Sequence, residues 1–314
     1  MNAIETRDLT KRYGAMTAVE NLNLTIPAGS VVGFIGPNGA GKTTTIRMLA
    51  GLLEPTSGEI LIHGEPIAHN SQRARWLVGY MPDFFGVYDD MKVWEYLDFF
   101  ARCYGLPAAK RASIVNELLQ LVDLADKKEA FVEALSRGMR QRLCLAHALV
   151  HDPAILLLDE PASGLDPRAR IEMRELLREL GRMGKTVLIS SHILTEMAEM
   201  VDSVAIIERG KLLAAGPMAD VARAARADKL LRVALVESTP ETLERTTAAL
   251  RSYPGVTDIF EAEGALEVAF SGDDVAASGL LRHLIQQEIL VLSFAEATSD
   301  LEDIFLRVTK GEVQ

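Results

Sequence analysis

The residues whose types and spacing most clearly suit chemistry form a glycine-rich segment near the N-terminus. Its members are Gly36, Pro37, Asn38, Gly39, Ala40, Gly41, Lys42 and Thr43, which fit the pattern G-x-x-x-x-G-K-[ST]. Glycines let the backbone curl so that its N–H groups face a phosphate, and the following helix dipole adds positive potential. Lys42 supplies a full charge, Thr43 offers a hydroxyl to Mg²⁺, and Thr44 offers one to a phosphate. A chance glycine turn is the less favoured interpretation, and the segment predicts binding of ATP with Mg²⁺.

Three further polar residues follow two apolar segments later in the chain. Asp159 and Glu160 follow the apolar residues 155–158, and His192 follows residues 186–191. A buried strand can deliver Asp159 to Mg²⁺, directly or through water, and Glu160 to a water that attacks the phosphate. His192 could hydrogen-bond the γ-phosphate, although a lone histidine after a strand is more often structural. Together with the glycine-rich segment, these residues predict ATP hydrolysis.

Strands that alternate with helices are expected to position these residues, which indicates an α/β fold with a largely parallel core sheet. The expected strands cover residues 3–6, 21–26, 30–35, 58–63, 154–158 and 186–190, a hairpin covers 201–215, and helices cover 42–50 and 168–182. The helical stretch from about 93 to 149 is too long for one crossover. We therefore expect a helical subdomain at about 90–150.

The last third of the chain has a different pattern. A linker is expected at residues 217–229, after which the order strand, helix, strand, strand, helix, strand suits a small α+β domain of ferredoxin-like fold. The predicted domains are thus 1–216, which carries the phosphate chemistry, and 230–314.

Composition limits the possible partners and setting. The 314 residues carry a formal net charge of −11, so nothing favours nonspecific binding of nucleic acid. Two cysteines are too few for a disulfide framework, and a reducing, cytoplasmic setting is expected. The N-terminus lacks the apolar core of a signal peptide, and no apolar run approaches the ~20 residues that span a bilayer. Any membrane association is expected to go through a partner.

Five motifs together resemble a known family. The glycine-rich segment, LSRGMRQ at 135–141, ILLLDEP at 155–161, SGLDP at 163–167 and SSH at 190–192 occur in this order. The chain resembles the ATP-binding subunit of an ABC transporter over about residues 4–216. The N-K-x-D motif that a GTPase would use to read guanine does not occur in the sequence. The resemblance implies a P-loop NTPase core with an antiparallel β subdomain and the inserted helical subdomain.

The resemblance also implies site residues and partners. Tyr13 matches the aromatic residue that stacks on adenine, and Asp166 matches the acid of the loop that links two sites. Ser136, Gly138 and Gln141 match the signature segment. In this family two domains pair head to tail with ATP between the P-loop of one and the signature of the other, which implies a homodimer that ATP closes and hydrolysis opens. An integral-membrane permease is the implied partner, at the cytoplasmic face of the membrane.

Two positions depart from the family pattern. Arg137 occupies the third signature position, where LSGGQ has glycine. It is either a tolerated variant whose side chain points to solvent or an added positive charge near the shared nucleotide. Asp83 ends Gly-Tyr-Met-Pro-Asp, where glutamine or glutamate normally touches Mg²⁺ and reports the nucleotide to the permease. Because aspartate is shorter, it is expected to reach the metal only through water.

Aromatic residues gather after Asp83. They are Phe84, Phe85, Tyr88, Trp94, Tyr96, Phe99, Phe100 and Tyr104. In the family this region receives the permease, and exposed aromatics make good interface anchors, although helical spacing favours the core for Leu97 and Phe100. His147 and His151 have the i, i+4 spacing of a metal pair, but no third ligand is evident.

The similarity of LEDIFLRVTKG, residues 301–311, to the C-terminal extension of drug, lipid and polysaccharide exporters favours export and a regulatory or dimerising tail. Two alternatives remain open. One is a soluble ABC ATPase that remodels a complex, although such proteins usually carry two cassettes or a long coiled coil. The other is a nucleotide-binding regulatory module.

Overall fold

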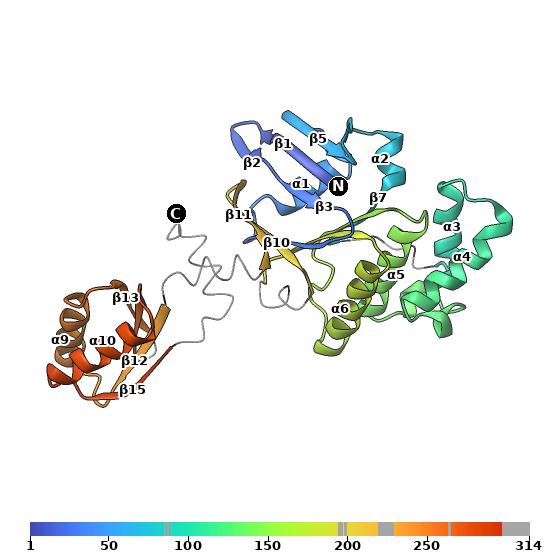
Figure 1. Cartoon of the computed structure of the whole chain (residues 1–314). Helices are drawn as coiled ribbons and strands as arrows, with labels where there is room; N and C mark the ends of the chain where they lie inside the picture. Colours follow the sequence, from blue (N-terminus) through green and yellow to red (C-terminus); the bar gives the residue numbers. More distant parts are fainter. Residues whose placement is uncertain are drawn as a thin grey trace. The chain divides into compact units, whose positions relative to one another are not determined.

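A six-stranded sheet lies at the centre of the N-terminal part of the chain (Figure 1). The structure is a computed structural model, and it describes residues 1–84, 86, 88, 90–193, 197, 200–218, 229–262 and 265–296. The strands of the six-stranded sheet, in sheet order, are β11 (Lys211–Pro217), β10 (Ser203–Glu208), β4 (Val31–Ile35), β9 (Thr186–Ser191), β8 (Ile155–Leu158) and β7 (Val78–Met81). All neighbouring pairs except β10–β11 are parallel. Strands β4, β8 and β9 are buried along their whole length, as continuous apolar runs in a parallel sheet should be. The predicted parallel core is therefore present.

A second, antiparallel sheet is built from the N-terminal residues. It contains β1 (Asn2–Tyr13), β2 (Met16–Leu22), β3 (Thr25–Pro27), β5 (Ser57–Ile62) and β6 (Glu65–Pro66). The single strand expected at residues 21–26 is wrong. Strand β2 ends at Leu22 and β3 begins at Thr25, and the two strands pair with different stretches of β1.

One buried apolar cluster joins the two sheets to the helix that follows the glycine-rich segment. The cluster contains Leu9 of β1, Phe34 of β4, Ile46 of α1 (Lys42–Leu49) and Leu157 of β8. The loop that precedes α1 is thereby anchored by packing on both sides.

The remaining helices of this unit are α2 (Gln72–Leu77), α3 (Val93–Cys103), α4 (Ala108–Leu121), α5 (Arg137–Leu149) and α6 (Pro167–Arg182), with short 3₁₀ turns at Ala125–Lys127 and Val132–Ala134. Helices α3, α4 and α5 pack on one another, and α5 also packs on β7 and α6. The sequence analysis did not predict α2 or β7, because six and four residues are too few to show a period. Strand β7 matters because it leads directly to Asp83 at the same sheet edge as Glu160.

The C-terminal residues belong to a separate unit, Ala219–Gln314, whereas the first unit is Met1–Met218. The described elements are β12 (Lys229–Leu235), α9 (Pro240–Arg251), β13 (Val256–Ala262), β14 (Ala265–Phe270), α10 (Asp274–Gln286) and β15 (Val291–Glu296). They form an antiparallel sheet of order β13-β14-β12-β15. Val233, Val268, Phe270, Leu250 and Leu280 form its buried core with both helices. The sequence LEDIFLRVTKG lies outside the described residues.

Candidate functional site

The glycine-rich loop connects the buried strand β4 to α1. Gly39 and Gly41 have φ values of 80° and 106°, which residues with a side chain rarely adopt. A side chain on Gly36 would collide with the backbone carbonyl of Ile207 on β10. Helix α1 begins after Gly41, and no side chain in this described segment caps it. Its first backbone N–H groups are therefore available to an anion, as a phosphate site requires.

A pocket of about 460 Å³ opens over this loop. It is lined by Tyr13, Met16, Ala18, Asn38, Gly39, Ala40, Gly41, Lys42, Thr43, Thr44, Asp83, Glu160, Ser163 and His192. The fold thus brings together five segments that are far apart in the sequence. Tyr13 stays half-exposed on the pocket lining, and the Nζ of Lys11 lies over its ring, 5.4 Å from the ring centroid.

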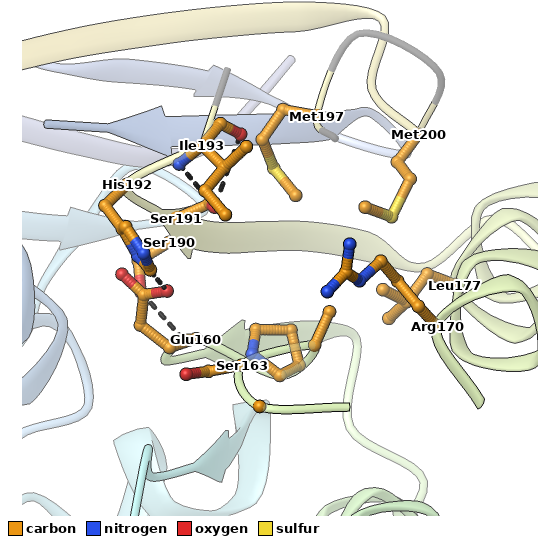
Figure 2. A pocket seen from close by; sticks show the side chains of 13 residues that line it. Glu160, Ser163, Arg170, Leu177, Ser190, Ser191, His192, Ile193, Met197 and Met200 are labelled. Atoms are coloured by element: carbon orange, nitrogen blue, oxygen red, sulfur yellow. Dashed lines mark hydrogen bonds and ion pairs between the residues drawn. The ribbon is translucent and has the colours of Figure 1, made fainter. Parts of the chain in front are cut away.

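Three charged or ionisable side chains meet at the floor of the pocket. The buried Lys42 donates from Nζ to the carbonyl oxygen of Gly36 at 2.6 Å and lies 3.5 Å from Oε1 of Glu160. The other oxygen of Glu160 lies 3.0 Å from Nδ1 of His192. Figure 2 shows Glu160 and His192 facing each other at one side of a smaller cavity, with Arg170 and Leu177 at the other side. Glu160 has a φ of 50°, an uncommon conformation that the surrounding contacts must hold.

Ser190 links the two carboxylates. Its fully buried hydroxyl donates to Oδ1 of Asp159 at 2.6 Å and accepts from the backbone N–H of Glu160 at 2.9 Å. In the sequence, Ser190 stands out only as part of the motif SSH, and nothing there predicts this role. Its position, beside His192 at the end of an apolar strand, was the available signal.

Asp159 carries an oxygen that has no partner within the described residues. Its side chain is 1% exposed, and Oδ2 is buried without a hydrogen bond. Burying a carboxylate oxygen without a hydrogen-bond partner costs folding free energy unless a cation or a water contacts it. The hydroxyl of Thr43 and the exposed carboxylate of Asp83 lie on the pocket wall. These groups and the Asp159 carboxylate are hard oxygen donors, the kind that suits Mg²⁺.

The signature segment lies elsewhere. Ser136 caps α5 by accepting from the backbone N–H of Met139 at 3.3 Å, and Asp166 caps α6 by accepting from Ala169 at 2.9 Å. Gln141 is buried and donates to the carbonyl oxygen of Ser163 at 3.2 Å. None of Ser136, Gly138, Gln141 and Asp166 lines the pocket over the loop in this chain.

The aromatic segment divides between core and surface. Tyr96 and Leu97 are buried, whereas Phe84 is 90% exposed, and Tyr88 and Phe99 are also exposed. Phe100 is partly buried and Phe85 lies outside the described residues. A group of exposed aromatic side chains therefore follows Asp83 directly.

The two histidines at i, i+4 pack against this aromatic segment. His147 stacks on Phe100 with ring centroids 3.6 Å apart, and His151 stacks on Tyr104 at 3.9 Å. A ring nitrogen of His151 lies 3.2 Å from the carbonyl oxygen of Val78. Within the described residues, no group of three His, Cys, Asp or Glu side chains could hold a metal. The packing supports the structural interpretation of both residues.

We expect the protein to lose stability as pH falls from 6.5 toward 4 because of these histidines. Burial lowers the pKa of both His147 and His151 to about 4, whereas an unfolded histidine titrates near 6.5. Between these values the unfolded chain binds more protons than the folded one, so protonation favours unfolding. The expected loss is on the order of 1–2 kcal/mol per histidine at pH 5. Urea unfolding at pH 7 and pH 5 measures it.

The variant His147→Phe should remove about half of that pH dependence, because the ring stack is kept and the titrating group is lost. His69→Gln is the matched control, since His69 is exposed. An unchanged pH dependence in His147→Phe would contradict the assignment.

Known proteins provide an independent comparison. Residues 19–163 match the ABC transporter family. The chain is 37% identical over 312 residues to Nod factor export ATP-binding protein I of Burkholderia lata, which covers 99% of this chain and 98% of that protein. It is 36% identical to the bacitracin transport ATP-binding protein BcrA of Bacillus licheniformis, over 98% of this chain and 97% of that one. The solved structure of an ATP-binding subunit of an ABC transporter matches with a TM-score of 0.63 and 32% identity, over 70% of this chain and 92% of the other.

The helices among the described residues are all too short or too polar to cross a membrane. The relatives match along nearly the whole chain, and the pocket brings the glycine-rich loop together with Glu160 and His192. The chain therefore belongs to the ATP-binding subunits of ABC transporters, the ATPases that power transport through a separate permease.

Proposed function

We propose that the protein powers export from the cytoplasmic face of a membrane, as a head-to-tail homodimer that binds MgATP and docks on a permease. The observation that carries the proposal is the incomplete pocket. Lys42, Glu160 and His192 line it, but Ser136 and Gly138 of the same chain do not. A second copy related by two-fold symmetry can supply the signature segment to each of two equal sites. Two relatives are a Nod factor export protein and a bacitracin transport protein, which supports a role in transport, and the first supports export.

In this mechanism the chain's own residues bind the nucleotide, orient it and activate the attacking water. The uncapped N-terminus of α1 and Lys42 hold the phosphates, and Tyr13 stacks on the adenine. Glu160 accepts a proton from the attacking water, while His192 holds the carboxylate in place and reaches the γ-phosphate. Lys42 must leave the Gly36 carbonyl and Glu160 to reach the phosphates, which frees the carboxylate to act as a base.

Thr43 and Asp159 would hold Mg²⁺, with Asp83 acting through a water. The unpaired Oδ2 of Asp159 supports this assignment, and Ser190 fixes the orientation of that carboxylate through its other oxygen. When bound, the metal would neutralise charge on the transferred phosphate group.

The exposed side chains of Phe84, Tyr88 and Phe99 form the proposed docking surface for the permease. Aromatic side chains contribute large contact areas at interfaces. Because Phe84 directly follows Asp83, a change at the metal side of the pocket can reach this surface over one peptide unit.

We expect Asp83→Ala to lose coupled transport more than ATP binding. Asp83 is exposed at the pocket wall, so the affinity for ATP should change less than about threefold. Transport in vesicles that contain the permease should fall about tenfold, since the signal from the nucleotide is lost. Measuring both quantities on one preparation decides the matter, and equal transport by variant and wild type would refute the assignment.

The C-terminal unit, residues 230–314, is proposed to be a ferredoxin-like domain that regulates the dimer or helps it form. The order of its described elements and the antiparallel sheet β13-β14-β12-β15 support that fold.

The direct test of the proposed function is reconstitution. A polytopic membrane protein encoded beside this chain should co-purify with it and raise its ATP turnover in vesicles. If no membrane protein binds and the dimer turns over ATP alone, a soluble remodelling ATPase is favoured. Negligible turnover that no permease rescues would favour a regulatory module.

A further inference from the structure

Arg137 turns back onto a loop of its own chain. It is the first residue of α5, and its Nη2 donates to the carbonyl oxygen of Ser163 at 3.1 Å. Its guanidinium lies flat against Gly164. A Cβ atom built on Gly164 would lie 2.5 Å from Cζ and Nη2 of Arg137 and 2.6 Å from Nη1. Only glycine leaves room for this packing, and its φ of 65° also favours glycine.

A second donor from the same helix reaches the same carbonyl. Gln141 lies four residues after Arg137, on the same face of α5, and its Nε2 donates to the Ser163 oxygen at 3.2 Å. The loop is fixed at its other end by Asp166, which caps α6. The segment 163–166 is therefore held by the signature helix on one side and by α6 on the other.

This loop also belongs to the chain's own nucleotide pocket. Ser163 lines the pocket together with Glu160, and the Ser163 N–H donates to the Glu160 carbonyl oxygen at 3.1 Å. Figure 2 shows Ser163 close to Glu160. Arg137 thus connects the signature segment to the segment that carries the catalytic carboxylate.

We propose that Arg137 is a positioning residue that couples the two nucleotide sites of the dimer. Its side chain ties the segment that meets the partner's ATP to the loop that lines the chain's own pocket, so the two must move together. The inference rests on the head-to-tail dimer proposed above. The Arg137 side chain is exposed, and its contacts with Ser163 and Gly164 add a third interpretation to the tolerated variant and the added positive charge.

The test is ATP turnover against ATP concentration for the full chain. Wild type should show a Hill coefficient clearly above 1. Arg137→Ala should lower kcat by about fivefold and bring the Hill coefficient close to 1, as expected for the loss of a hydrogen bond at an exposed position. Binding of a fluorescent ATP analogue to the dilute chain should change less than twofold, because Arg137 does not line the pocket.

Three variants separate positioning from other effects. Arg137→Lys keeps the charge but loses the planar fork, so it should not restore the Hill coefficient. Gly164→Ala should displace the Arg137 guanidinium and reproduce the loss of cooperativity. The double variant Arg137→Ala/Gly164→Ala should have a Hill coefficient no lower than that of Arg137→Ala, apart from any effect of strain at residue 164. Arg182→Ala is the control, since its described partner is Glu179 at the end of α6.

The outcomes distinguish the inference from the proposed function. Full rescue by Arg137→Lys, or unchanged cooperativity in Arg137→Ala, overturns the inference alone. A wild-type dimer with a Hill coefficient of 1 also overturns it. A protein that stays monomeric with ATP when turnover is blocked instead contradicts the proposed dimer.

Discussion

Replacing Glu160 with glutamine is expected to slow ATP turnover by about 10²- to 10⁴-fold, the usual contribution of a general base. The amide cannot accept the proton of the attacking water. It keeps the size of the carboxylate and can still hydrogen-bond His192, which lies 3.0 Å away. ATP binding should persist, because the loop and Lys42 are unchanged. The arrested protein should therefore accumulate as an ATP-bound dimer.

Two measurements test this result on the same preparation. Phosphate release gives the turnover, and sedimentation velocity with and without MgATP gives the mass. Glu179→Gln is the matched control, because Glu179 is an exposed carboxylate on α6 paired with Arg182. If Glu160→Gln turns over ATP within a few-fold of wild type, Glu160 is not the general base. A monomer in saturating ATP would contradict the sandwich dimer.

Lys42→Ala is expected to weaken ATP binding by roughly 100-fold. The ammonium group is 6% exposed and is the full positive charge at the floor of the described pocket. Charge-assisted hydrogen bonds contribute about 1.5–3 kcal/mol each, so losing those to the phosphates removes about 3 kcal/mol of binding free energy. Titration with a fluorescent ATP analogue measures the change directly.

The same substitution tests the ion pair of the nucleotide-free state. Without Lys42, Glu160 keeps its contact with His192 in the described part of the pocket, so thermal stability should change little or fall slightly. Lys211→Ala is the control, since that exposed lysine pairs with Glu20 outside the pocket. Affinity within threefold of wild type would mean that the phosphates bind elsewhere.

Local patterns predicted the elements that hold the loop. The apolar run before Gly36 and the helix-compatible residues after Gly41 match β4 and α1 closely. Elements without a period of their own were missed. Strand β7 has four residues and is defined by its parallel pairing with β8, which lies far along the chain. The break between β2 and β3 lies where the chain changes from one stretch of β1 to another, and a change of pairing partner leaves no local pattern.

Contacts between segments that are distant in the sequence could not be predicted either. The motif SSH indicated that Ser190 mattered, but its hydrogen bonds to Asp159 and Glu160 exist only because β8 and β9 are neighbours in the sheet. The spacing of His147 and His151 fits a pair of metal ligands as well as a pair of structural residues packed inside the protein. The aromatic rings stacked on them decide between the two.

The sequence by itself determined the chemistry of the loop at residues 36–43. A phosphate-binding loop is formed by consecutive residues, so their types and spacing in the sequence already define the site. The tertiary structure alone decided which side chains meet that loop. Glu160 and His192 reach it through the order of the strands, while Ser136 and Gly138 do not. Arg137 illustrates the difference, since its contact with Gly164 depends on how α5 and α6 pack, and no local pattern encodes that distance.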